Sequence, residues 1–172
     1  MCKANNSVRQ TILFCSLIFL FSCIKENEMQ VDSVRFSDIK ENEKVEVEFS
    51  SAGCFHHYID FYEFTGTQEK KVEVALFESS WSEKENRPIK LEKSGKLELK
   101  EEELKQLDRL IKFYQSEPEG GCTTMNHIKL KLIRKGKVVV EKEYEDASCA
   151  TYDMEDLMTF EFIKQRIEEN NK

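Results

Sequence analysis

Polar and hydrophobic residues alternate in the segment 44–49, where every second side chain is Val or Phe and those between are Lys or Glu. This period of two is typical of a β-strand with one buried face. Two more strand patterns follow at 55–64 and 70–77, separated by a turn that contains glycine. The three segments predict an antiparallel meander.

Beyond the meander the pattern is less regular until a helix begins. We expect a loop at 81–88, followed by two short strands at 89–91 and 96–99 around a turn at Ser94-Gly95. Helical spacing then extends from Glu101 to about Ser116 and predicts an amphipathic helix. Its apolar stripe consists of Leu104, Leu107, Leu110, Ile111 and Tyr114.

A hairpin and a second helix are predicted for the rest of the chain. The hairpin strands are 125–133 and 137–145, and the last helix begins at about Asp153, a suitable N-cap. The apolar positions of that helix are Leu157, Phe160, Ile163 and Ile167. These elements predict a single α+β domain at 44–172, with two helices packed on one face of an antiparallel sheet.

The turn of this hairpin can be chosen by matching the faces of its two strands. A two-residue turn would pair Leu130 with Glu141, and so bury a carboxylate or expose a leucine. A three-residue loop at 134–136 instead pairs Leu132 with Val138. We therefore expect the three-residue loop.

The N-terminus has the pattern of an export signal. Residues 1–10 carry two positive charges and no negative one, and residues 11–22 form an apolar run. A membrane-spanning helix needs about 20 apolar residues, so this run is too short to span a bilayer. We expect residues 1–22 to be removed on export.

The end of this signal, Leu20-Phe21-Ser22-Cys23, resembles the lipobox of bacterial lipoproteins. The resemblance implies that Cys23 becomes the acylated first residue. The mature chain would then be anchored to a membrane of the bacterial cell envelope, the outer in preference to the inner, with its domain in the periplasm or at the cell surface. An ordinary signal peptide with a cysteine there by chance is the alternative. The mature domain is also similar to small envelope lipoproteins, which implies no particular activity.

Export leaves three cysteines available to the mature domain. Two of the six leave with the signal and Cys23 carries lipid, so Cys54, Cys122 and Cys149 remain. An oxidising compartment favours one disulfide and one free thiol among them. The three-residue hairpin loop, extended past the strands, places Cys122 opposite residue 148, so we expect the bond Cys122–Cys149. A bond from Cys54 to either partner is the alternative.

Residues 24–43 are rich in Lys, Glu, Asn and Asp, and their few apolar residues are isolated. This composition predicts a flexible tether, which at about 20 residues spans roughly 25 Å. We expect residues 23–43, the lipidated cysteine and the tether together, to hold the domain away from the bilayer.

The charge balance indicates the kind of partner. The chain has 26 Lys and Arg residues against 33 Asp and Glu, a net charge of −7. Removal of Lys3 and Arg9 with the signal changes this to −9. Nucleic-acid binding needs a positive stripe, which the sequence lacks, whereas an acidic surface favours a basic protein partner.

The strand pattern at 55–64 and the residues before it hold the side chains that could carry recognition or chemistry. The candidate binding residues on one face of that strand are Cys54, His56, Tyr58 and Tyr62. His57 falls on the opposite face and is predicted to be a core histidine. Cys54 and His56 could instead serve a thiol-dependent enzyme or a soft metal, although their spacing matches no strong metal motif.

The sequence contains no P-loop, dinucleotide fingerprint or Ser-His-Asp order. We therefore expect a lipid-anchored protein with a non-catalytic role, in which it binds a partner, inhibits an enzyme or supports an envelope assembly, without a cofactor. The alternative is a metal-binding or thiol-dependent enzyme that uses Cys54 and His56.

Overall fold

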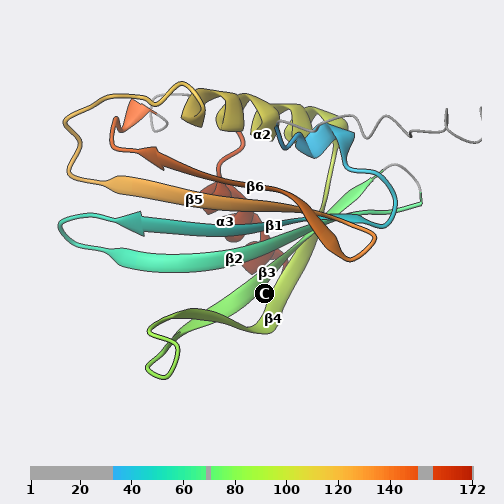
Figure 1. Ribbon diagram of the computed structural model, residues 1–172, viewed down its shortest axis with the longest axis horizontal. Helices are drawn as coiled ribbons and strands as arrows, with labels where there is room; N and C mark the ends of the chain where they lie inside the picture. The colour runs from blue at the N-terminus through green and yellow to red at the C-terminus, as the bar shows by residue number, and fades with distance from the viewer. Residues whose placement is uncertain (1–32, 69–70, 151–156, 172) are drawn as a thin grey trace, which may run out of the picture. The chain divides into compact units, whose positions relative to one another are not determined.

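The computed structural model describes residues 33–68, 71–150 and 157–171, which form a six-stranded antiparallel sheet with two α-helices (Figure 1). The elements are η1 (Phe36–Asp38), β1 (Glu43–Ala52), β2 (His57–Gly66), β3 (Val72–Ser82), β4 (Arg87–Leu99), α2 (Glu101–Tyr114), β5 (Met125–Arg134), β6 (Lys137–Asp146) and α3 (Phe160–Asn170). The strand order is β4-β3-β2-β1-β5-β6. The predicted α+β fold, with a meander and a C-terminal hairpin, is confirmed.

Both helices pack on one face of the sheet and share a single core with it. The ring of Phe160 in α3 lies 5.3 Å from that of Phe49 in β1 and 5.5 Å from that of Tyr62 in β2. Leu107 and Leu110 of α2 are fully buried in the same hydrophobic cluster. We call this side of the sheet the covered face and the opposite side the open face.

The first described residues belong to the domain, which differs from the predicted tether. Val34, Phe36 and Ile39 are buried in the core, and the Phe36 ring lies 4.6 Å from that of Phe64. Asp108 of α2 accepts hydrogen bonds from the backbone N–H groups of residues 36 and 37. These apolar residues follow no strand or helix period, because their burial comes from contacts with elements that are distant in sequence, such as β2 and α2. The domain therefore includes residues before 44, and residues 24–32 lie outside the described part of the chain.

The turn between β3 and β4 lies at 83–86, within the loop predicted at 81–88, and the two predicted short strands are parts of the single strand β4, which forms one long hairpin with β3. Gly95 lies inside β4 and makes no turn. A Cβ atom at this position would come within 2.5 Å of Cγ2 of Ile167, so glycine allows α3 to pack directly on the strand. Register shifts beside Phe77 interrupt the pairing, and the outer part of the hairpin, residues 77–93, is hereafter called the arm (Figure 1).

The β5–β6 hairpin has a two-residue turn, in place of the predicted three-residue loop. Lys135 and Gly136 both have positive φ angles, 49° and 73°, which fit a type I′ turn. A bulge between Leu132 and Ile133 then shifts the register, so that Leu132 pairs with Val140. The bulge removes the mismatch that counted against a two-residue turn, because the carboxylates of β6 now lie on the open face.

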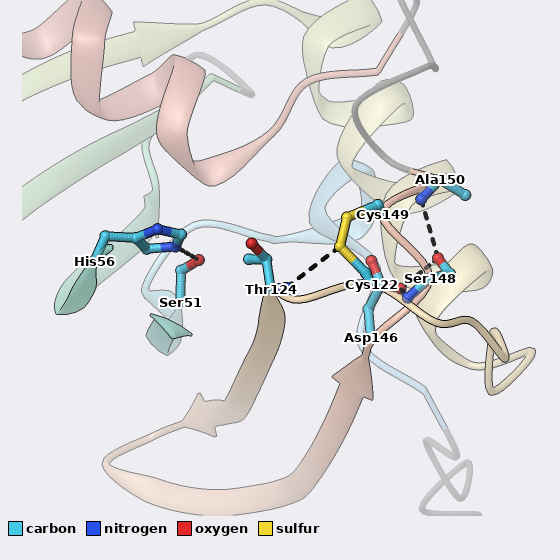
Figure 2. The surroundings of a disulfide bond; sticks show 8 residues. All are labelled: Ser51, His56, Cys122, Thr124, Asp146, Ser148, Cys149 and Ala150. Atoms are coloured by element: carbon cyan, nitrogen blue, oxygen red, sulfur yellow. Dashed lines mark hydrogen bonds between the residues drawn. A yellow bond between two sulfur atoms is a disulfide. The ribbon is translucent and has the colours of Figure 1, made fainter. Parts of the chain in front are cut away.

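The predicted disulfide Cys122–Cys149 is confirmed, with 5.5 Å between its Cα atoms (Figure 2). The observed register differs from the predicted one, because when it is extended past β5 it sets Cys122 opposite Ala150 and not residue 148. The N–H group of Cys122 donates to the carbonyl of Ala147 at 3.0 Å. The hydrogen bond and the disulfide together join the segment before β5 to the segment after β6, at the base of the hairpin.

Helix α3 begins later than predicted. Its N-cap is Thr159, whose hydroxyl accepts a hydrogen bond from the N–H of Phe162 at 3.2 Å. Residues 157–159 are not helical, and the predicted cap Asp153 lies outside the described residues. The predicted core positions Phe160, Ile163 and Ile167 are all buried.

Candidate functional site

Cys54 lies in the turn between β1 and β2, outside the strand alternation from which its face was predicted. The turn is closed by a hydrogen bond from the N–H of Gly53 to the carbonyl of His56 at 2.9 Å. Cys54 is exposed and carries a free thiol, and its neighbour Phe55 is fully exposed. His57 is exposed, so its prediction as a core histidine is wrong.

The face of β2 that carries Tyr58 and Tyr62 is the covered face. Tyr62 is 1% exposed, and its hydroxyl donates to the carbonyl of Phe160 at 2.9 Å. Tyr58 is partly buried and donates to Oε1 of Glu161 at 3.3 Å. Both tyrosines therefore hold the start of α3 in place, and Tyr62 is not available to a partner at the surface.

His56 makes its hydrogen bond to β1 and stacks near one of the two tyrosines. Its Nε2 atom lies 3.0 Å from Oγ of Ser51, a fully buried residue of β1. In Figure 2 this pair lies to one side of Thr124, and the disulfide lies to the other. The structure therefore brings together only His56 and Tyr58, whose rings lie 5.7 Å apart.

The thiol and metal alternatives find little support in this geometry. No group of three or more His, Cys, Asp or Glu side chains within the described ranges is arranged to hold a metal ion. A nucleophilic cysteine needs a base within hydrogen-bond reach. Among the hydrogen bonds of the described residues, the one that His56 makes through its ring joins it to Ser51.

A partly buried ionic cluster connects β2 to α3. Nζ of Lys164 lies 2.8 Å and 3.0 Å from the two carboxylate oxygens of Asp60. Burial, together with the Asp60 charge, raises the pKa of the Tyr62 phenol well above its usual value. Burial also raises the pKa of Glu161, against the hydrogen bond that it accepts from Tyr58. The cluster orients α3 on the sheet. Within it, Glu161 is the carboxylate whose charged form is disfavoured by burial.

Replacing Glu161 with glutamine is expected to raise the melting temperature at neutral pH. Folding raises the pKa of this carboxyl, so its contribution to stability is complete in acid and is lost as the pH rises through the folded-state pKa. Glutamine stays neutral and can still accept from Tyr58. Thermal unfolding from pH 4 to pH 8 should show that the melting temperature of E161Q exceeds that of the wild-type protein by an amount that grows with pH. The exposed control E168Q should show none, and an equal response of both variants would contradict this account.

The open face carries a groove that sequence analysis did not identify. The arm overhangs the sheet and the two enclose a volume of about 690 Å³. The groove is lined on the sheet by Glu46, Glu48, Phe61, His127, Lys129, Lys131 and Glu143, and on the arm by Glu85, Arg87, Pro88, Ile89 and Lys90. The one sequence feature that could have indicated this groove is Phe61, an aromatic residue on the face of β2 opposite Tyr58 and Tyr62.

Contacts between the arm and β2 help to fix this overhang. Oγ of Ser79 donates to the carbonyl of Ile59 at 2.6 Å. The ammonium of Lys90 lies 3.1 Å from Oε2 of Glu63 and 3.8 Å from the centre of the Phe77 ring. The arm also exposes Trp81, of which 57% is accessible. The groove therefore has a polar and apolar lining of the mixed kind that binding sites use.

Comparison with known proteins gives no family assignment, since neither a family model nor a curated protein matches the chain. Within the described ranges, neither helix has the length and apolar character needed to cross a membrane.

Proposed function

We propose that this chain is a lipid-anchored protein of the bacterial cell envelope whose open sheet face binds a basic protein partner. The observation that carries the proposal is the groove of about 690 Å³ between the arm and the sheet. The likeness of the segment ending at Cys23 to a lipobox supports the anchor, and the net charge of −9 after removal of the signal supports a basic partner.

The asymmetry of the sheet explains why the open face is the binding surface. The covered face is filled by the buried side chains of α2 and α3, which leaves no room for a partner. Neither of the two described α-helices lies on the open face, and the groove volume lies within the range of about 300 to 1,000 Å³ that is usual for ligand pockets. A partner can therefore reach Phe61 without displacing any element of the fold.

Site-specific photo-crosslinking in intact cells tests the surface. A benzoylphenylalanine side chain in place of Phe61 should give a discrete crosslinked protein, because position 61 lines the groove. The same side chain in place of Lys112, an exposed residue of α2, is the matched control. Equal crosslinking from both positions, or none from position 61, would overturn the proposal for the open face.

The anchor is tested by the mass and the distribution of the mature protein. The wild-type chain should fractionate with membranes and begin at an acylated Cys23, because several acyl chains bind a bilayer firmly. The variant C23A should lose the acyl mass and the membrane fraction, whereas C54A should keep both. An unmodified Cys23 in the wild-type protein would contradict the proposed anchoring.

A further inference from the structure

The open face of the sheet neutralises most of its charges internally. Carboxylates and ammonium groups alternate across neighbouring strands and form ion pairs within the face. These pairs are Lys44–Glu46 at 2.9 Å, Lys90–Glu63 at 3.1 Å, Lys129–Glu143 at 2.6 Å and Lys131–Glu141 at 3.2 Å. On the arm, Arg87 pairs with Glu85. An ion-paired face attracts a charged ligand only where one of its charges has been left without a partner.

Glu48 is such a charge on the sheet side of the groove. In the strand register it lies between Phe61 of β2 and Lys129 of β5. The ammonium of Lys129 contacts Glu141 and Glu143 of β6. Glu48 is partly buried, and its carboxylate makes no hydrogen bond or ion pair with the side chains or backbone of the described residues, although its backbone is paired in the sheet. A carboxylate that is partly removed from water gains from a cationic partner more than a fully exposed one does.

We propose that the groove receives an extended segment of the partner protein, which places a lysine or arginine side chain on the carboxylate of Glu48. This inference rests on the proposed function and names the chemistry that the groove recognises. The ring of Phe61, the neighbour of Glu48 across the strands, lies where the aliphatic stem of such a side chain can pack. The ammonium or guanidinium group then forms a charge-assisted hydrogen bond with Glu48.

The dimensions of the sheet favour an extended chain. The sheet residues of the groove come from four neighbouring strands, β2, β1, β5 and β6. At about 4.8 Å between strands this is roughly 14 Å, the length of about four residues in an extended chain. Pro88 and Ile89 of the arm provide apolar contacts for the side chains that flank the cation. The expected ligand is therefore a basic residue with apolar neighbours.

The contact can be tested with the mature full-length protein in detergent and a synthetic probe. The probe is a fluorescent peptide in which one lysine is flanked by valines, and its binding is followed by anisotropy. E48Q should weaken binding about tenfold or more, the usual effect of losing a hydrogen bond between charged groups. E145Q removes an exposed carboxylate from the same face outside the groove and should leave affinity unchanged. Neither variant should alter the melting temperature, because the carboxylates of Glu48 and Glu145 have no hydrogen-bond or ion-pair partner among the described residues.

Charge reversal separates a direct contact from an indirect effect. E48K should reject the lysine peptide and bind the same peptide with glutamate in place of lysine. Equal affinities of E48Q and E145Q for the lysine peptide would overturn the contact, and the proposed function would stand if position 61 still crosslinks. If the wild-type protein does not bind the peptide but still crosslinks from position 61, the proposal that the groove receives an extended basic segment would be overturned.

Discussion

Replacing Phe36 with alanine is expected to lower the free energy of unfolding by about 3 to 5 kcal/mol, the usual cost of removing a buried phenylalanine ring. Phe36 is fully buried, and its ring packs edge-on against Phe64. The change would leave a cavity between η1 and the sheet, because Asp108 still holds the backbone of residue 36 in place. Urea unfolding of the wild-type protein and F36A, followed by circular dichroism, measures the difference.

The matched control for this experiment is R35A, because Arg35 is the exposed neighbour of Phe36. Its effect should stay within about 0.5 kcal/mol, as is usual for surface substitutions. Equal stabilities of F36A and R35A would mean that residues 33–42 behave as the tether that their composition indicates. A large difference places the beginning of the folded domain before β1.

Removing the disulfide with the double substitution C122S and C149S is expected to cost about 3.5 kcal/mol. The bond closes a loop with a sequence separation of 27 residues, and the stabilisation comes mainly from the restriction of the unfolded chain. The native contacts around it, including the bond from Cys122 N–H to Ala147, can persist without the sulfur bridge. The unfolding midpoint in urea should therefore fall, with the folded spectrum unchanged.

The variant C54S is the control for the disulfide, because Cys54 is exposed and unbonded. Its stability should match that of the wild-type protein to within about 0.5 kcal/mol. Peptide mapping without reduction should recover Cys122 joined to Cys149. A peptide that joins Cys54 to either of them, or a stability loss in C54S as large as that in the double variant, would contradict the assignment.

Several features of the fold were predictable because they depend on residues close together in the chain. The alternation in 44–49 and the stripe from Leu104 to Tyr114 each report one buried face, so both β1 and α2 were found, although β1 continues to Ala52 and α2 ends at Tyr114. The strands of the final hairpin were also found. Its turn was not, because a bulge beside Ile133 adds a residue that a regular ladder does not contain.

The candidate site could not be found in the same way. Strand β2 has aromatic residues on both faces, so its own pattern does not decide which face is buried. Tyr62 is buried because α3 packs over it, and its hydroxyl then donates to the carbonyl of Phe160, which is 98 residues away in sequence. The choice of face then leaves Phe61 on the open side, where it lines the groove.

The sequence by itself determined the α+β class, most of the strands and the helix α2, because periodicity and spacing are properties of short segments. Only the tertiary structure decided where the domain begins, which face of β2 is covered and where the arm lies. Each of these depends on packing between distant segments. An example is the packing of α3 against Gly95 of β4. The isolation of Glu48 has the same origin, since its neighbour Lys129 binds the carboxylates of β6.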